Sequence, residues 1–187
     1  MKKSIFFLLT LLSFTYPGCS NKTNPGNDTT SSAAKQTSTV AEVTSVERRD
    51  GKAPNFSWQD SGGKKIDFTS VSGKLTLINF WATWCGPCKH EMPDLIALNK
   101  EYESRGLTII GISADVGSSA IEDVKSFVQE QGIPYRVLLA NEDIKEAFGN
   151  VNMLPTSFLI DKDGKILETL IGARSKASFA QVIDKHL

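Results

Sequence analysis

The chain has 187 residues, which is enough for one domain with a full hydrophobic core and some additional unfolded length. Its 21 basic residues balance its 21 acidic residues, so the composition gives no reason to expect nucleic acid or a charged surface as a partner. Only three residues are cysteines, which excludes a small scaffold held together by several disulfides.

Residues 1–18 have the pattern of a secretory signal peptide. Two lysines precede a short apolar run, residues 5–14, which has too few residues to span a bilayer. Cys19 then follows Gly18 directly, which resembles the lipobox of bacterial lipoproteins, in which that cysteine is lipidated. A lipobox usually has leucine three positions before the cysteine, where this chain has Tyr16. We expect export and lipidation of Cys19; the alternative is plain signal cleavage, with Cys19 an incidental residue.

Residues 19–52 are predicted to form a disordered tether. Small and polar residues dominate this segment, and it has too few large apolar residues to offset the entropy of folding. A flexible coil of this length would span about 30 Å. The folded domain is therefore expected to occupy residues 53–187.

The first half of that domain begins with a predicted β-hairpin. Residues 55–58 and 65–68 are its strands, because a Gly-rich turn separates them. Residues 75–81 are apolar on both faces, which is typical of a central strand covered by helices. A helix over residues 88–105 follows, and Pro93 is expected to kink it.

The second half alternates strands and helices and then closes with a hairpin and a helix. Ser119 and Glu122 have the spacing of a capping box, Asn141 and Ser175 are expected to be N-caps, and Leu187 is expected to face inward. This order of elements predicts an α/β domain with a central mixed sheet flanked by helices. The predicted elements are strands at 107–112 and 136–140, helices at 119–131 and 142–148, a hairpin of 156–161 and 165–171, and a helix from 176.

The chemistry of the chain is concentrated in Cys85-Gly86-Pro87-Cys88. Two thiols three residues apart, at the junction of a strand and a helix, can close a small disulfide ring. The N-terminus of the helix favours a thiolate at Cys85, which indicates reversible thiol–disulfide exchange. A zinc site is the alternative, but zinc needs four ligands and only His90 is nearby. We expect no metal and no cofactor.

Residues 80–89, Phe-Trp-Ala-Thr-Trp-Cys-Gly-Pro-Cys-Lys, resemble the active-site segment of the thioredoxin superfamily. Residues 153–156, Met-Leu-Pro-Thr, stand where that superfamily has its cis-proline. More specifically, residues 53–187 resemble the membrane-tethered TlpA/ResA group, which is related to the AhpC/TSA redoxins. The resemblance implies a thioredoxin-like fold with an N-terminal β-hairpin and an inserted helix–strand unit. The matching positions are Pro54-x-Phe56, Gly73-Lys74, Glu91 and the additional helix and strand over 119–140.

Catalytic roles are expected for Cys85, Cys88 and Glu91. Cys85 would attack a partner's disulfide, and Cys88 would then resolve the mixed disulfide. Glu91 lies on the helix face of Cys88, and burial would raise its pKa and allow it to carry the proton. The TlpA/ResA group has a glutamate at this spacing, whereas Asn79 replaces the aspartate of cytoplasmic thioredoxins. The alternative for Glu91 is a solvated first-turn glutamate.

Substrate contacts are expected at Trp84, Leu154 and Pro155. A cis bond before Pro155 would turn the Leu154 backbone toward Cys85, where an extended substrate could pair as an added strand. Trp84 is expected to form an apolar rim, while Trp81 could be rim or core.

The predicted function is reduction of disulfides in exported proteins, at the periplasmic face of a bacterial membrane. The resemblance suggests cytochrome c maturation, with apocytochrome c as a client and a transmembrane protein as the electron donor. We expect a monomer held by an N-terminal lipid. One alternative is a peroxiredoxin-type peroxidase, although such enzymes usually have threonine where this chain has Ala82. The other is a non-catalytic binding module.

Overall fold

The computed structural model describes residues 39–187. The predicted signal peptide, Cys19 and the first part of the predicted tether lie outside the described residues. Within residues 39–187, no helix is long and apolar enough to cross a bilayer.

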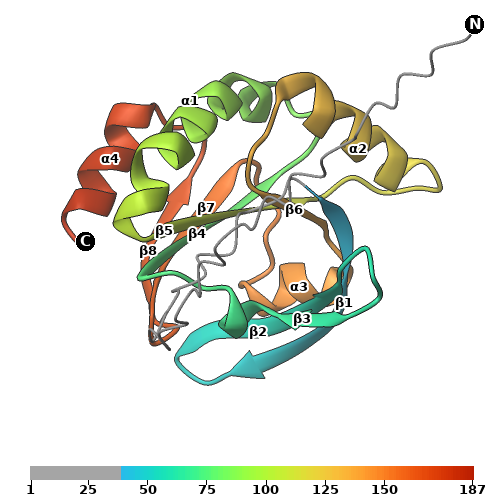
Figure 1. Ribbon diagram of the computed structural model, residues 1–187, viewed down its shortest axis with the longest axis horizontal. Coiled ribbons are helices and arrows are strands. Elements are labelled where there is room, and N and C mark those ends of the chain that lie inside the picture. Colours follow the sequence, from blue (N-terminus) through green and yellow to red (C-terminus); the bar gives the residue numbers. More distant parts are fainter. Residues whose placement is uncertain (1–38) are drawn as a thin grey trace, which may run out of the picture. The chain divides into compact units, whose positions relative to one another are not determined.

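An eight-stranded mixed sheet forms the centre of the domain, with the strand order β3-β2-β1-β6-β5-β4-β7-β8 (Figure 1). β4, β5, β6 and the first residues of β1 run parallel, whereas β2, β3, β7 and β8 are antiparallel to their neighbours. The predicted mixed α/β fold is therefore confirmed. The strands are β1 Val40–Arg49, β2 Lys52–Gln59, β3 Lys65–Asp67, β4 Leu75–Trp81, β5 Leu107–Ser113, β6 Arg136–Leu139, β7 Thr156–Asp161 and β8 Ile166–Ile171.

Helices cover both faces of this sheet. α1, α2 and α4 pack on one face, and α3 packs on the other together with apolar residues of β1 and β2 (Figure 1). Every residue of β4 is buried, as expected for a strand covered on both sides. The helices are α1 Gly86–Tyr102, α2 Ala120–Gln131, α3 Glu142–Ala147 and α4 Lys176–Asp184, with short 3₁₀ turns at Phe68–Ser70 and Glu103–Arg105.

Alternation along β4 assigns its side chains to the two faces. Leu75, Leu77 and Trp81 belong to the apolar cluster that includes α1, while Ile78 and Phe80 belong to the cluster that includes α3. Side chains in a strand point alternately to opposite faces, so the odd-numbered residues of β4 face α1. This register places Asn79, a polar residue of β4, on the face that carries α1.

The structure corrects the predicted start of the domain. Val40–Arg49 was expected to belong to the tether but forms β1, which pairs with β6 through its first residues and with β2 along most of its length. Its composition is polar because half of its residues are exposed to solvent, and Val43 is its one buried residue. The hydrogen bonds that order this segment come from β2, the next strand along the chain, and from the distant strand β6, and composition does not report them.

Two smaller expectations also fail, both at helix ends. The Ser119 side chain makes no capping bond, because its backbone is near-helical (φ −96°, ψ −6°) rather than extended. Leu187 lies beyond the end of α4 and is 40% exposed. The other two caps are confirmed: Asn141 accepts from the Ile144 N–H at 2.9 Å, and Ser175 accepts from the Ser178 N–H at 3.3 Å.

Candidate active site

Cys85 and Cys88 form a disulfide at the N-terminus of α1. Cys85 is the N-cap residue, and its Sγ accepts a hydrogen bond from the Cys88 N–H at 3.3 Å. The two side chains are little exposed, Cys85 at 6% and Cys88 at 1%. Sγ of Cys85 therefore lies at the positive end of the helix dipole, beside a backbone donor, which stabilises a thiolate once the disulfide is reduced.

Glu91 lies one turn after Cys88 on α1 and is buried, with 2% of its surface exposed. Its Oε1 accepts from the Asn79 Nδ2 at 2.9 Å, and its Oε2 accepts from the Arg174 N–H at 2.7 Å. Burial raises the pKa of Glu91 to about 7, although both hydrogen bonds act to lower it. Glu91 is thus not a solvated first-turn residue, and near neutral pH it can both bind and release a proton.

The amide of Asn79 links Glu91 to the sheet. Its Nδ2 also donates to the Ser157 Oγ at 2.9 Å. Asn79 and Ser157 are direct partners across the antiparallel β4–β7 pair, so their side chains share the face that carries α1. Ser157 was not predicted as a site residue, because its place beside Asn79 depends on the register of strands 78 residues apart.

A buried tyrosine lies close to the same carboxyl. Tyr135 donates its hydroxyl hydrogen to the Met92 Sδ at 2.9 Å. Burial, and in second place the charge of Glu91, raise the pKa of Tyr135, so it stays protonated at neutral pH. No motif in the sequence pointed to Tyr135, which precedes β6 and reaches the site only through the fold.

The peptide bond between Leu154 and Pro155 is cis, as the resemblance implied. The Pro155 carbonyl accepts from the Gly172 N–H at 2.9 Å, which joins this segment to the end of β8. Leu154 packs against the apolar cluster that contains both cysteines. Leu154 also packs against the cluster on the other face of the sheet, so the cis peptide bond is observed and the contact with substrate stays a prediction.

The two tryptophans near the cysteines have different surroundings. Trp84 is 67% exposed, which fits the predicted apolar rim. Trp81 is buried in the core and packs against Phe127 with ring centroids 5.1 Å apart. Of the two alternatives for Trp81, rim or core, the structure therefore supports the core.

Other exposed apolar side chains neighbour the predicted substrate residues. Met153 precedes Leu154 and is 59% exposed, and Ile171 pairs across the sheet with Thr156 and is 52% exposed. Met153 and Ile171 line one pocket together with Phe148 and Phe158, on the face of the sheet that carries α3, and neither cysteine lines it.

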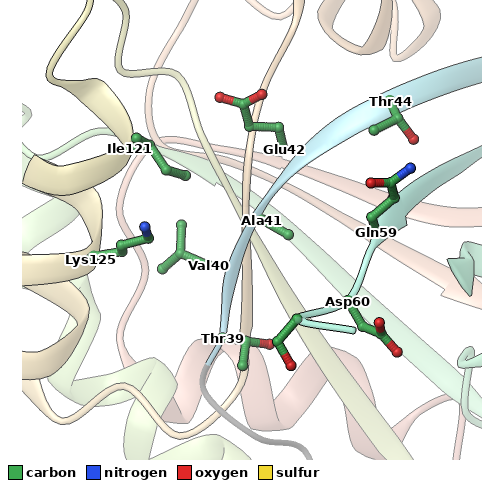
Figure 2. A pocket seen from close by; sticks show the side chains of 10 residues that line it. Thr39, Val40, Ala41, Glu42, Thr44, Gln59, Asp60, Ile121 and Lys125 are labelled. Carbon is green, nitrogen blue, oxygen red and sulfur yellow. The ribbon is translucent and has the colours of Figure 1, made fainter. Parts of the chain in front are cut away.

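In the described part of the chain, no cluster of side chains could hold a metal ion, and the cysteines do not line the pocket shown in Figure 2. Residues 39–187 contain no group of three His, Cys, Asp or Glu side chains able to hold a metal ion, and His90 is exposed. A pocket of about 590 Å³ lies between the start of β1, the end of β2 and α2 (Figure 2). Neither cysteine lines it, nor does any residue of α1 or of the cis-proline segment.

The model of the AhpC/TSA family matches residues 50–169. The chain belongs to the AhpC/TSA family. Among curated relatives, the thiol-disulfide oxidoreductase ResA of Bacillus anthracis is 42% identical over 135 residues, or 72% of this chain and 76% of the relative. ResA of Bacillus subtilis (strain 168) is 36% identical over 126 residues, or 67% of this chain and 68% of the relative.

Solved structures give the same picture of this AhpC/TSA family member. A thiol:disulfide interchange protein of the thioredoxin family from Chlorobium tepidum TLS superposes with a TM-score of 0.64 at 36% identity, covering 75% of this chain and 98% of the other. The chain is thus a ResA-like member of the thioredoxin superfamily and a thiol–disulfide oxidoreductase.

Proposed function

We propose that this oxidoreductase reduces disulfides of exported proteins, with Cys85 as the attacking thiolate, Cys88 as the resolving thiol and Glu91 as the proton carrier. The observation that carries the proposal is the buried Glu91 carboxyl, with its pKa near 7, one helical turn from the disulfide. An inert cysteine pair would have no need of a titrating group kept out of water at this position.

The exchange proceeds in two steps. The Cys85 thiolate attacks one sulfur of the client's disulfide, so a mixed disulfide forms and the client's second sulfur leaves as a thiolate. Cys88 then attacks Cys85 Sγ, which closes the disulfide seen in the structure and releases the reduced client. Each turnover moves two electrons from the enzyme to the client, and a separate donor must return them.

Proton transfer is the difficult part of the second step. Cys88 is almost completely buried, and burial opposes the thiolate form that it needs for attack. Glu91 can accept the Cys88 proton as a general base, because its pKa near 7 balances proton uptake and release. The amide of Asn79 holds the Glu91 carboxyl in place by a hydrogen bond.

The client is proposed to bind over the apolar surface beside the disulfide. Trp84 supplies the rim, and the backbone of Leu154, just before the cis peptide bond, offers an edge along which an extended segment can pair. The exposed side chain of Met153, next to Leu154 in the chain, favours a client with apolar residues near its disulfide.

The cellular setting belongs to the same proposal. The pattern of residues 1–18 supports export, and Cys19 supports a lipid anchor at the periplasmic face of a bacterial membrane. A monomer in that compartment would depend on a transmembrane protein for electrons. A second solved structure from Chlorobium tepidum, described as a putative thiol:disulfide interchange protein DsbE, is 28% identical to this chain with a TM-score of 0.64. Reduction of apocytochrome c would fit this setting.

Trapping of mixed disulfides tests the proposal. In Cys88→Ser the second step cannot occur, so clients should remain attached to Cys85 and be identified by mass spectrometry. The matched control is Cys85→Ser, which should capture none. Equal capture by the two variants would contradict the assigned roles, and rapid peroxide consumption without a dithiol partner would favour a peroxidase.

A further inference from the structure

Asp115 is a buried carboxyl that the exchange steps above do not use. It lies two residues after the end of β5 and is 6% exposed. Its Oδ2 accepts from the Thr83 N–H at 2.9 Å and from the Ser113 Oγ at 2.6 Å, and its Oδ1 accepts from the Thr83 hydroxyl. A carboxylate out of water needs such donors, and here three of them converge on one side chain.

Two of the three donors belong to Thr83, which lies in the loop between β4 and α1, two residues before Cys85. Trp84, the next residue, is 67% exposed and so does not anchor this loop by burial. The Cys85 N–H donates to the Ala82 carbonyl at 3.1 Å, which is a bond within the loop itself. Asp115 is therefore the side chain that ties the centre of the loop to another part of the fold.

We propose that Asp115 is a positioning residue for thiol exchange, because through Thr83 it holds the loop that places Cys85 at the N-terminus of α1. The inference rests on the proposed role of Cys85 as the attacking thiolate. Cys85 Sγ lies 3.3 Å from the Cys88 N–H, and that contact together with the helix dipole favours the thiolate. A loosened loop weakens this stabilisation, so the pKa of Cys85 rises and its attack slows.

Two substitutions separate the hydrogen bonds of Asp115 from its charge. In Asp115→Asn the amide oxygen can accept from the Thr83 N–H and from Ser113, while the NH₂ group donates to the Thr83 hydroxyl, which can turn to accept. Asp115→Ala removes every acceptor. A positioning role therefore predicts that asparagine restores what alanine loses, although both lack the charge.

The experiment uses the reduced full-length chain. The rate of its reaction with 5,5′-dithiobis(2-nitrobenzoate) over a range of pH reports the pKa of Cys85, and reduction of insulin with dithiothreitol reports kcat/KM. Asp115→Ala should raise the pKa of Cys85 and lower kcat/KM about tenfold. Asp115→Asn should behave like the wild type, as should Asp123→Ala, which removes an exposed carboxylate from the first turn of α2.

An unchanged Cys85 pKa and kcat/KM in Asp115→Ala would overturn the inference, as would an Asp115→Asn variant as impaired as Asp115→Ala. If Asp115 only stabilised the fold, Asp115→Ala would lower the free energy of unfolding and leave the pKa of Cys85 unchanged. If Asp115→Ala does not fold, Thr83→Val provides the test, because it removes the hydroxyl donor and keeps the backbone N–H donor to Asp115. The pKa of Cys85 should then rise in Thr83→Val, and an unchanged pKa would overturn the inference. A wild-type chain that cannot reduce insulin would instead contradict the proposed function.

Discussion

Glu91 is the one buried glutamate among residues 39–187, and its surroundings differ from those of a surface glutamate. Its two carboxylate oxygens each accept one hydrogen bond, from the Asn79 amide and from the Arg174 N–H, and the rest of its surface is enclosed by the fold. Desolvation outweighs the hydrogen bonds, so the proton is held more tightly than in water. This balance has one consequence for activity and one for stability.

Glu91→Gln should lower the rate of client reduction near pH 7 by about 10²-fold, the lower range for loss of a general acid or base. Glutamine keeps the hydrogen bond from Asn79 but cannot take up the Cys88 proton. The measurement is insulin reduction as a function of pH, in which the ionisation near pH 7 should disappear. The control is Glu103→Gln, which changes an exposed glutamate just after α1. A full rate with an unchanged pH profile would remove Glu91 from the mechanism.

The raised pKa of Glu91 also predicts how stability depends on pH. The folded chain holds the Glu91 proton up to about pH 7, while the unfolded chain releases it near the ordinary glutamate value of 4.5. The folded state therefore binds more protons between these values, so this contribution is complete below about pH 4.5 and is lost as pH rises through 7. The loss should be about 3 kcal/mol at most.

Urea unfolding of the oxidised wild type and of Glu91→Gln, compared over this pH range, measures that contribution. The free energy of unfolding of the wild type should fall relative to that of the variant as pH rises. Parallel curves for the two proteins would show that Glu91 titrates in the folded chain as it does in the unfolded one.

At the scale of elements, β5 has a glycine where β4 contributes a large side chain. A Cβ added at Gly111 would lie 2.9 Å from the Trp81 Nε1, closer than such atoms normally approach. Trp81 is buried at the end of β4, four residues before Cys85, and packs on Phe127 of α2. The glycine thus lets β5 and α2 enclose the indole directly before the active-site loop.

Gly111→Ala should lower the free energy of unfolding by about 2 kcal/mol, because overpacking forces either Trp81 or the strand to move. Urea unfolding followed by tryptophan fluorescence measures this change. Gly62→Ala is the control, since its nearest contact for an added Cβ is an ordinary 3.4 Å to the Asp60 Oδ1. Equal stability of the two variants would mean that the Trp81 indole can shift without cost.

At the scale of the whole molecule, β1 connects the β2–β3 hairpin to the rest of the sheet. It is the strand that pairs both with β2 and with β6, so without it the edge of β6 and one side of β2 would lose their partners. Phe56 and Trp58 of β2 belong to the core cluster that also contains Phe80 of β4. The hairpin is therefore part of the core of the domain and not an appendage.

A chain that begins at Thr39 should fold and reduce insulin at the rate of the full chain, whereas a chain that begins at Ala53 should be strongly destabilised or fail to fold. The shorter chain lacks β1 and with it the pairing of two strands. Circular dichroism and urea unfolding of both chains make the comparison. Equal stability would restore the domain boundary that composition predicted.

Local features were the ones that the sequence could predict. The Cys85–Cys88 disulfide, the central strand before it and the caps at Asn141 and Ser175 depend on residues a few positions apart. Helix ends and paired thiols are decided by short-range geometry, so their pattern can be read along the chain. Even here the Ser119 cap failed, because the Ser119 backbone is near-helical and not extended.

The sequence by itself determined the thiol chemistry and the α/β fold, and it placed a glutamate one turn from the cysteines. Only the tertiary structure decided that β1 belongs to the sheet, that Ser157 joins Asn79 beneath Glu91 and that Asp115 holds Thr83. These contacts join residues from different strands and loops. Their energies depend on strand register and on exclusion of water, and both exist only once the chain has folded.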